Sequence, residues 1–531
     1  MGTVVEISSL GTAWSRLGPT PPPASLKRKR TLTMSDQSSA HSTPAEANRR
    51  KFLMLSGAAA VATVVGGAVP AVAATETVGR FSSYPFALGV ASGDPLADSV
   101  ILWTRLAPEP LVIGSGMPQQ KFAVHWQVAD DEKFSQIVRE GETFALPEHN
   151  HSVHVDVQGL TPDRWYYYRF RCGSELSPVG RTRTLPAPGA HVEKFSISHV
   201  SCQNWATGYF TPLEYMAEDD LDLAFHLGDY IYEGAITAAA PRNGAPITDE
   251  IRAQCKTLDQ YRLRYSIYKT DKGLQAAHAA YPWAIVCDDH EVSNDYAGGT
   301  NQWPSQLDRR AAGYKAWWEN IPTRLPAPVG PEMRIYRRFA VGDLVQFDML
   351  DSRQYRIADN DPVVSRIGDV QEKWLLDGIK AYDTTWNFLA QGQQLGGVTT
   401  NSPTRNRIYK TYYDQNVSPI ILSGDMHWTI AQDSLLEIPR ADSPIVGSEF
   451  IVTSVTSTGD GPGSQSTKDG WLKNPWVKYV DGYRGYIRSV ITPQGVSSTQ
   501  RDVQYITRPN APIWDAQNFY IEAGKPGIQI A

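Results

Sequence analysis

The amino-acid sequence predicts a layered α/β protein preceded by an all-β sandwich domain. From about residue 192 onward, five short apolar runs alternate with helix-like stretches, and each run ends in a cluster of polar residues. Alternating strand and helix signals are typical of a layered α/β domain. Between residues 80 and 188, several short aromatic-rich stretches alternate apolar and polar residues, a pattern typical of a β-sandwich.

Length and composition set the first limits. The chain has 531 residues, too many for a single hydrophobic core, so we expect two or three structural units. Hydrophobic residues make up 41% and charged residues 20%, as in ordinary globular proteins. The formal net charge of -6 argues against specific nucleic-acid binding, which needs a basic face. Four cysteines are too few for a disulfide framework, and we expect Cys202 to bind a metal and the others to be structural.

The first 80 residues or so are predicted to lie outside the fold. Residues 34–73 have the features of a twin-arginine (Tat) signal peptide, with paired arginines, a mildly apolar run and small residues for cleavage. We therefore expect recognition by the Tat export machinery and a secreted protein, periplasmic or extracellular. The apolar run is short and is interrupted by glycines and Pro70, so we expect no stable membrane anchor. Residues 1–33 are interpreted as an over-extended reading frame.

Residues 80–188 are predicted to form a non-catalytic β-sandwich domain. The predicted strands cover residues 100–105, 121–128, 152–157 and 165–171. Their period of two is typical of half-buried strands. The aromatic run at 165–171 could also provide a platform for carbohydrate, but core packing is the favoured interpretation. A link at 185–189, which contains proline and glycine, separates this domain from the next.

Residues 192–500 are predicted to form the catalytic α/β domain, and residues 501–531 a C-terminal segment that is a candidate cover for the site. The apolar runs span residues 195–200, 221–227, 284–287, 347–350 and 419–422, and helix-like stretches include 258–268, 309–320 and 369–380. Ligands of open α/β sheets bind where the carboxyl ends of parallel strands meet. We therefore expect the polar clusters that follow the runs to converge.

The clusters contain the side chains that a two-metal hydrolase needs. Cys202, Asp229 and Tyr232 follow the first two runs, and a thiolate with a phenolate favours a ferric ion because both are strong anionic donors. Asp229 is the best candidate to bridge two cations, because a shared carboxylate relieves their mutual repulsion. Two such metals can clamp the attacking and leaving oxygens of a displacement at phosphorus.

The later clusters add harder ligands and candidate catalytic groups. Oxygen ligands suited to Ca²⁺ or Mg²⁺ are offered by Asp289, Asn294 and Asp425. His427 could bind a metal through neutral imidazole. His290 could donate a proton to the leaving alkoxide. Arg353 is predicted to hold a phosphate oxygen through charge-assisted hydrogen bonds.

Each motif also has a simpler interpretation. The Asp-Asp-His-Glu cluster at 288–291 could be a solvated loop, and the Asp-Ser-Arg at 351–353 a salt-bridged turn. Tyr232 alone could be a packed aromatic with a wet hydroxyl. Their joint occurrence at the ends of five predicted strands favours a hydrolytic metal site.

The motifs resemble those of a known family. The similar stretches are Ala91-Ser92-Gly93-Asp94-Pro95, Leu102-Trp103-Thr104-Arg105, Ser201-Cys202-Gln203, Gly228-Asp229-Tyr230-Ile231-Tyr232-Glu233, Asp288-Asp289-His290-Glu291, Leu350-Asp351-Ser352-Arg353 and Ser423-Gly424-Asp425-Met426-His427. Together they resemble the PhoD-like alkaline phosphatases, which belong to the calcineurin-like metallophosphoesterase superfamily. The resemblance covers nearly all of the chain that follows the predicted signal peptide.

The resemblance implies a metallophosphoesterase-type β-sandwich flanked by helices, with a ferric ion (Fe³⁺) and calcium (Ca²⁺). By residue matching, Cys202, Asp229 and Tyr232 form the iron set, and Asp229 is shared with calcium. Asn294 and Asp425 match calcium-side ligands, whereas the matches of Asp289 and His427 are less direct. The wider superfamily has Asp-x-His where this chain has Ser201-Cys202-Gln203, and Gly-Asn-His-Glu where it has residues 288–291. These departures put in doubt any transfer from purple acid phosphatases at Cys202 and Asp289.

We therefore predict a secreted, metal-dependent phosphoric ester hydrolase. It would be an alkaline phosphatase and phosphodiesterase that uses a metal-bound hydroxide on phosphate monoesters and diesters and serves phosphate scavenging. One alternative is a secreted phospholipase D, because such enzymes look similar in fold and motifs. Another is an exported binding or adhesion protein with a degenerate enzyme fold, against which the intact set of acidic, thiolate and phenolate side chains argues.

Overall fold

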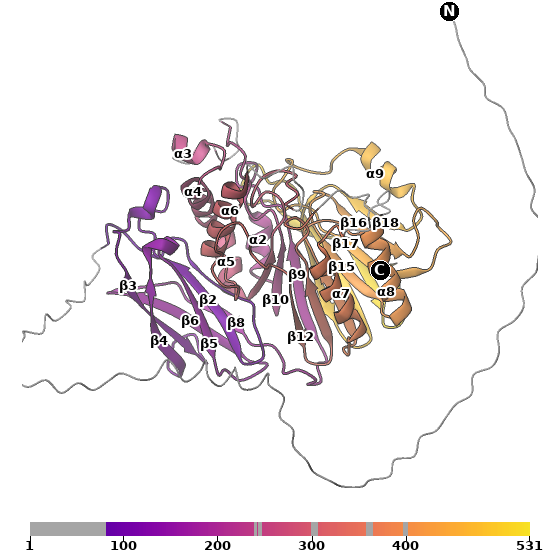
Figure 1. The fold of residues 1–531 in the computed structure, drawn as a ribbon, viewed down its shortest axis with the longest axis horizontal. Coiled ribbons are helices and arrows are strands. Elements are labelled where there is room, and N and C mark those ends of the chain that lie inside the picture. Colours follow the sequence, from indigo (N-terminus) through magenta and orange to yellow (C-terminus); the bar gives the residue numbers. More distant parts are fainter. Residues whose placement is uncertain (1–80, 238–241, 243–246, 299–305, 357–364, 397–401) are drawn as a thin grey trace, which may run out of the picture. The chain divides into compact units, whose positions relative to one another are not determined.

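The computed structural model describes residues 81–531, except 238–241, 243–246, 299–305, 357–364 and 397–401 (Figure 1). The predicted signal peptide at 34–73 and the segment 1–33 therefore lie outside the described residues. Within the described part of the chain, no helix combines the length and the apolar character needed to cross a membrane.

Two sheets pack face to face at the centre of the described chain (Figure 1). The larger one has ten strands, and its middle consists of the parallel strands β9 (Phe195–Val200), β10 (Leu223–Leu227) and β11 (Trp283–Val286). The smaller one has seven strands and contains the parallel neighbours β13 (Val345–Met349), β14 (Trp386–Ala390), β15 (Pro419–Ser423) and β17 (Ile445–Ile451). All five predicted apolar runs are strands in these sheets.

The outer strands and the helices complete the layers. The ten-stranded sheet also includes β1 (Val90–Gly93), β2 (Ser99–Arg105), β5 (Ser152–Gln158), β19 (Arg484–Ile491), β20 (Gly495–Val503), β21 (Ile513–Glu522) and β22 (Gln529–Ile530). The seven-stranded sheet also includes β12 (Arg337–Val341), β16 (Thr429–Leu435) and β18 (Val477–Asp481). The helices are α2 (Thr211–Met216), α3 (Asp249–Arg252), α4 (Leu258–Lys269), α5 (Lys272–Ala280), α6 (Leu307–Asn320), α7 (Asp369–Lys380), α8 (Pro403–Gln415) and α9 (Gln465–Leu472), with short 3₁₀ turns at Ile113–Gly116 and Pro147–His149.

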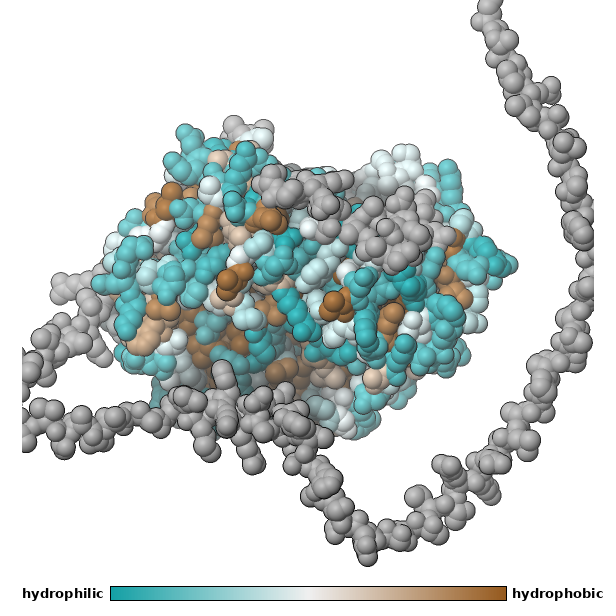
Figure 2. Space-filling view, in the orientation of Figure 1, coloured by the Kyte–Doolittle hydropathy of each residue, from teal (hydrophilic) through white to brown (hydrophobic). Residues whose placement is uncertain are grey.

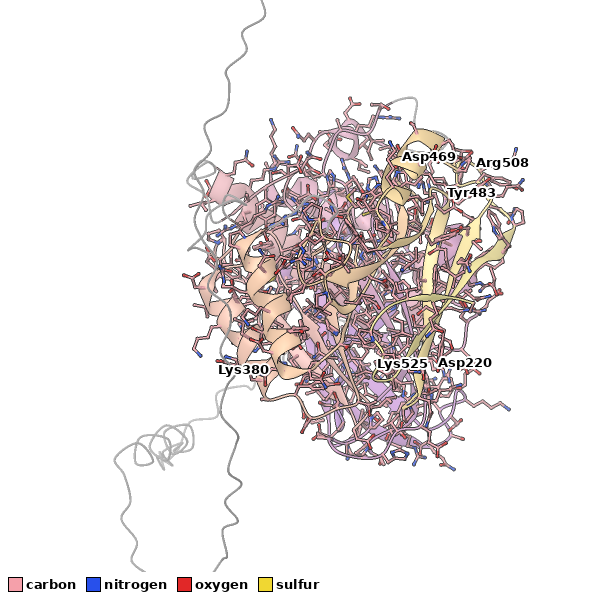
Figure 3. All side chains as sticks on the ribbon, turned by 90° about the vertical axis from the view of Figure 1, so that its right-hand side faces the viewer. Asp220, Lys380, Asp469, Tyr483, Arg508 and Lys525 are labelled. Atoms are coloured by element: carbon pink, nitrogen blue, oxygen red, sulfur yellow. The ribbon has the colours of Figure 1, made fainter. Side chains whose placement is uncertain are left out.

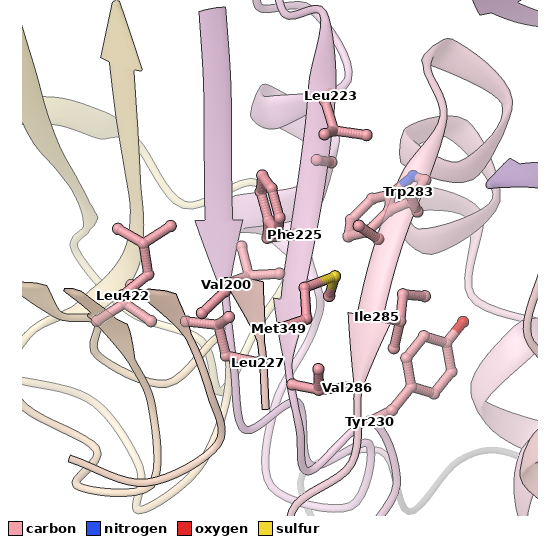
Figure 4. Close-up of a cluster of buried hydrophobic side chains, with 14 of the residues drawn as sticks. Val200, Leu223, Phe225, Leu227, Tyr230, Trp283, Ile285, Val286, Met349 and Leu422 are labelled. Carbon is pink, nitrogen blue, oxygen red and sulfur yellow. The ribbon is translucent and has the colours of Figure 1, made fainter. Parts of the chain in front are cut away.

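The main hydrophobic core lies between the two sheets. Val200 and Leu227 of the larger sheet face Met349 and Leu422 of the smaller one, and all four are fully buried (Figure 4). The ring of Phe225 on β10 lies 4.9 Å from that of Phe347 on β13, centroid to centroid. Strands covered on both faces need apolar side chains at nearly every position, which explains why the sequence shows them as continuous runs.

Helices cover the outer faces of both sheets (Figure 1). On the larger sheet, α4 and α6 pack their buried aromatic residues into the main core. On the smaller sheet, α7 and α8 pack against Leu389 of β14 and Ile421 of β15. The expected helices at 258–268, 309–320 and 369–380 correspond to α4, α6 and α7. The mixed α/β fold with helix-covered sheets is thereby confirmed.

The N-terminal region forms a sandwich that shares a layer with the rest of the protein. One layer is a five-stranded antiparallel sheet made of β3 (Phe122–Ala129), β4 (Ile137–Ala145), β6 (Trp165–Cys172), β7 (Glu175–Leu176) and β8 (Gly180–Arg183). The other layer is β1, β2 and β5, and β1 pairs with β11 through Gly93 and Trp283. Tyr166, Tyr168 and Phe170 are buried in this sandwich, in agreement with the core-packing interpretation of the aromatic run.

The C-terminal segment adds strands to the larger sheet. Strand β21 pairs with β20, and β22 pairs with β21. The connection between β20 and β21 approaches other loops, because the backbone N–H groups of Ile506 and Thr507 donate to Asp460 and that of Tyr209 donates to Ile506. These bonds tie the connection between β20 and β21, which is part of the predicted cover at 501–531, to the loops that contain Asp460 and Tyr209.

The surface is mainly hydrophilic on the face shown in Figure 2, where apolar residues are scattered singly or in small groups. Lys380 on α7, Asp469 on α9 and Lys525 after β21 are exposed on another side (Figure 3).

A buried histidine on β9 links stability to pH. His199 is fully buried, and neither of its ring nitrogens has a hydrogen-bond partner among the residues that the structure describes. Burial lowers the pKa of His199 to about 3. Because the unfolded chain protonates this histidine near pH 6.5, the unfolded state binds more protons between about pH 3 and pH 6.5. The free energy of unfolding should therefore fall as the pH drops through this window.

We predict that His199→Leu makes the protein less sensitive to acid. At pH 7 the change removes an unsatisfied buried polar group and should cost little. When the pH falls from 7 to 5, the free energy of unfolding of the parent should decrease by about 2 kcal/mol more than that of the variant. Urea unfolding at both pH values measures this, with exposed His191→Leu as the control. Identical pH dependence in His199→Leu and the parent would contradict the prediction.

Candidate metal centre

The loops that follow β9, β10, β11 and β15 meet at one edge of the two sheets. The backbone N–H of Cys202 donates to the carbonyl of Gly228 at 3.1 Å, and that of Gln203 donates to the carbonyl of Asp229 at 3.0 Å. The loop after β15 brings His427 against Tyr232, with 3.0 Å between the imidazole Nε2 and the phenolic oxygen. Side chains from both sheets therefore share one site.

Three overlapping groups of side chains there could each hold a metal ion. They are Cys202, Asp229 and His427; Asp229, Asp289 and His290; and Asp288, Asp289 and Asp425, with the ligand atoms of each group within 4.8 Å of one another. Asp229 belongs to the first two groups, and Asp289 links the second to the third. The groups thus form a continuous row of donors rather than separate clusters.

Tyr232 lies beside the first group. Its hydroxyl donates to Asp229 Oδ2 at 3.0 Å and lies 3.0 Å from His427 Nε2. Burial, and next the charge of Asp229, raise the pKa values of both Cys202 and Tyr232 well above their ordinary ranges. A thiolate and a phenolate at this position therefore need a nearby cation to stabilise them.

His290 lies over the ring of Tyr232, with 4.1 Å between the ring centroids. Its Nδ1 contacts Glu233 Oε2 at 2.7 Å, and its backbone N–H donates to Asp229 at 3.3 Å. Burial opposes the charged form, but Asp229, Glu233 and Asp289 together raise the pKa of His290 to about 10. These carboxylates therefore favour the protonated form of His290.

Arg353 lies among the carboxylates of the third group. Its side chain is 1% exposed, and its nitrogens lie 2.5 Å from Asp288, 3.3 Å from Asp289 and 3.2 Å from Asp425. Nη1 is buried and has no hydrogen bond within the described residues. It lies 3.9 Å from the exposed carboxylate of Asp295. The guanidinium therefore balances buried negative charge and can still donate a hydrogen bond from Nη1 to another acceptor.

Asn294 differs from the other predicted site residues. Its side chain is exposed, and the amide nitrogen donates to Asp295 at 2.8 Å. Its backbone N–H donates to Glu233 at 2.9 Å, which fixes the loop beside His290. In this structure the Asn294 side chain is thus hydrogen-bonded to Asp295, which is not one of the predicted metal ligands.

Several of these residues have a backbone conformation that side chains disfavour. The φ angles of Cys202, Asp229, Asp425 and His427 are 58°, 54°, 71° and 55°. Each such residue costs on the order of 1 kcal/mol and persists where its surroundings hold it in place. Gly228, with φ of 95°, lies in the same turn as Asp229, and a Cβ there would lie 2.5 Å from Asp288. The glycine thus allows two ligand-bearing loops to touch.

Known proteins match the chain over almost its whole length. The profile of the PhoD-like phosphatases matches residues 195–499, and the profile of their N-terminal domain matches residues 71–186. The chain belongs to the PhoD-like phosphatase family. It is 40% identical over 519 residues to alkaline phosphatase D of Bacillus subtilis (strain 168), covering 91% of this chain and 89% of that protein. A solved structure of PhoD matches with a TM-score of 0.80 and 40% identity, covering 85% of this chain and 93% of the other.

Membership of the PhoD-like phosphatases confirms the resemblance inferred from the motifs. It identifies the protein as a phosphoric ester hydrolase and argues against the binding or adhesion alternative. The enzymes of this family depend on metals, and the three overlapping groups provide acidic, thiol and imidazole donors for them.

The sequence did not reveal separate roles for three acidic residues of this PhoD-like phosphatase, which are Asp288, Glu233 and Glu291. Asp288 belongs to the third group and pairs with Arg353. Glu233 orients His290, as described above. Glu291 is fully buried and accepts the backbone N–H groups of Asp229, Tyr230 and Asp288 at 3.2, 2.6 and 2.8 Å. The Asp-Asp-His-Glu motif was the available signal, but its spacing does not reveal which carboxylate faces a ligand and which faces the backbone.

The hydroxyl-rich stretch 453–458, which follows β17, was missed altogether. It touches Cys202, Tyr232 and His427 through hydrogen bonds of Ser457 and Thr458. Its sequence carries no charge and no common metal ligand, so nothing in its composition marked it.

We predict that Glu291→Gln lowers both stability and hydrolytic activity. The amide keeps the size of the side chain but turns one acceptor into a donor that faces backbone N–H groups. Hydrogen bonds to a charged group contribute about 1.5–3 kcal/mol each, so we expect a loss of about 2–5 kcal/mol in the free energy of unfolding. Urea denaturation measures it, with exposed Glu218→Gln as the matched control. A loss below about 0.5 kcal/mol would show that Glu291 does not hold the two loops together.

Proposed function

We propose that this PhoD-like phosphatase is a secreted enzyme that hydrolyses phosphate monoesters and diesters at alkaline pH with the help of iron and calcium, for phosphate scavenging. The observation that carries the proposal is the continuous row of donors, in which Asp229 is shared by a thiol-containing group and an oxygen-rich one. A shared carboxylate is the arrangement that lets two cations lie close together.

The donor types support a ferric ion at one end of the row. Cys202, Tyr232, Asp229 and His427 combine a thiol, a phenol, a carboxylate and an imidazole. Their deprotonated forms are strong anionic donors, and the imidazole suits iron as well. The buried, unionised state of the thiol and phenol described above is the state that a bound cation would reverse.

The other end of the row fits calcium. Asp288, Asp289 and Asp425 offer only carboxylate oxygens, which are the ligands that Ca²⁺ prefers. Asp289 Oδ1 is buried, and within the described residues it makes no hydrogen bond but lies 3.3 Å from the Nη2 of Arg353, so its charge is balanced and its lone pairs stay available to a ligand. Asn294 would join this set by turning its exposed side chain away from Asp295. When bound, the two metals supply Lewis acidity to the phosphoryl group and activate water.

The protein's own residues would handle the leaving group and the phosphoryl charge. His290 is held between Glu233 and Tyr232, next to Asp229, and in its protonated form it can donate a proton to the departing alkoxide. Nη1 of Arg353, which makes no hydrogen bond within the described residues and lies 3.9 Å from Asp295, can donate to a phosphoryl oxygen while the rest of the guanidinium stays paired with the buried carboxylates.

Export is the part of the proposal that rests on sequence alone. The paired arginines and apolar run within residues 34–73 support recognition by the Tat machinery and a periplasmic or extracellular location. The Tat route carries folded proteins, so the metals could be loaded before export.

We predict that removing the metals abolishes hydrolysis and that adding both back restores it. The full chain, treated with a chelator until elemental analysis finds no iron or calcium, should lose at least about 100-fold in rate on p-nitrophenyl phosphate and on bis(p-nitrophenyl) phosphate, because metal activation of water supplies several kcal/mol. Iron and calcium together should restore the rate. Undiminished activity after complete metal removal would contradict the proposal.

Two variants test the iron assignment. Cys202→Ser should lose bound iron, and Tyr232→Phe should shift or abolish the visible charge-transfer absorption, whereas Cys172→Ser in the N-terminal sandwich should keep both. A colourless parent that holds stoichiometric ferric iron would contradict the assignment. Choline release from phosphatidylcholine vesicles in excess of phosphate release from the monoester would instead support phospholipase D activity.

A further inference from the structure

We infer that Ser457 and Thr458 are positioning residues that orient Tyr232 and His427 through hydrogen bonds. Both lie in the stretch 453–458, here called the hydroxyl loop, which follows β17 of the smaller sheet. The inference rests on the proposed iron site, because Tyr232 and His427 are candidate ligands there.

Ser457 acts on the phenolic oxygen of Tyr232. Its hydroxyl donates to that oxygen at 2.7 Å and lies 3.1 Å from the carbonyl oxygen of Cys202. When Tyr232 binds a cation as phenolate, its oxygen has no proton left and can only accept. Ser457 then provides a hydrogen bond that draws electron density away from the metal-binding atom.

Thr458 acts on His427. Its hydroxyl oxygen lies 3.1 Å from Nδ1, while Nε2 lies 3.0 Å from the oxygen of Tyr232. A neutral imidazole carries one N–H and one lone pair. When Nε2 offers its lone pair to a cation in the group of Cys202 and Asp229, Nδ1 carries the proton. The threonine hydroxyl can accept that Nδ1–H and so holds the ring with Nε2 toward the group.

The backbone of Thr458 supports a role beyond packing. Its φ is 67°, and a β-branched residue in this left-handed region is a genuine outlier. The residue is exposed, so burial in a core does not account for it. Backbone strain of this kind gathers at functional sites, where surrounding contacts hold it. A glycine would relieve the strain but would lack the hydroxyl.

Neighbouring contacts fix the hydroxyl loop in place. Arg484 on β19 donates to the carbonyls of His427 and Gly459, each at 2.8 Å, and so ties together the two sides of the Thr458 contact. Ser454 accepts the backbone N–H of Ser457 at 3.1 Å and donates to its carbonyl at 2.9 Å. Thr456 donates to the carbonyl of Asn204, in the loop after β9, at 2.9 Å.

The test uses the full chain loaded with iron(III) and calcium. The variants are Ser457→Ala, Thr458→Val, Thr458→Ser and Thr458→Gly, with Thr499→Val on β20, whose hydroxyl bonds Asn518, as the control. The readouts are the wavelength of the visible absorption band, the dissociation constant of iron by chelator competition, and the thermal midpoint of the metal-free chain.

We expect Ser457→Ala to move the band to longer wavelength, because the phenolate loses a hydrogen bond and its electrons are more easily transferred to the metal. Thr458→Val and Thr458→Gly should weaken iron binding about 10- to 100-fold, and Thr458→Ser should restore it. Because glycine relieves the strain, the thermal midpoint of metal-free Thr458→Gly should not fall below that of the parent.

The outcomes separate this inference from the proposed function. A parent with a visible iron band and variants with unchanged wavelength and affinity would overturn the inference and leave the proposed function standing. A metal-free Thr458→Gly chain with a clearly lower midpoint would assign Thr458 a structural role and also overturn it. A parent that binds no iron would overturn both.

Discussion

Buried negative charge is the constraint on which the rest of the site depends. Asp229, Asp288 and Asp289 are all nearly inaccessible to solvent, and Asp425 lies against them. Like charges this close, away from water, raise one another's pKa values unless cations lie between them. Arg353 lies among the carboxylates on one side, and protonated His290 lies beside Asp229 on the other. The fold therefore supplies part of the compensating charge itself, and the donor row is suited to receive the remainder as metal ions.

Holding these groups together requires a strained backbone and a set of fixed hydrogen bonds. Left-handed residues lie in the loops that follow strands of both sheets, as at Asp229 after β10 and His427 after β15. The carboxylate of Glu291 binds the loops after β10 and β11 to each other, and Arg484 binds the loop after β15 to the hydroxyl loop. Because each loop is held by several bonds, a ligand finds its donors already in position, which is the usual way in which metal sites gain affinity and rate.

Much of the fold could be predicted from local pattern. Apolar runs of strand length gave the central strands of both sheets, since strands that are covered on both faces need apolar side chains along their whole length. Pattern did not show that β1 pairs with β11, so that the N-terminal sandwich and the catalytic part share one sheet. Alternating polarity shows which face of a strand is buried, but the identity of the neighbouring strand depends on contacts between distant parts of the chain.

By itself, the sequence determined which kinds of side chain stand at the strand ends, and hence the metal-dependent chemistry and the family. Only the tertiary structure decided which partner each of those side chains contacts. It paired Arg353 with four carboxylates, turned Glu291 to the backbone, and placed uncharged Ser457 and Thr458 against Tyr232 and His427. The physical reason is that spacing along a strand fixes where a residue emerges, whereas its partner is chosen by packing against distant segments, such as Tyr232, which lies 225 residues before Ser457 in the chain.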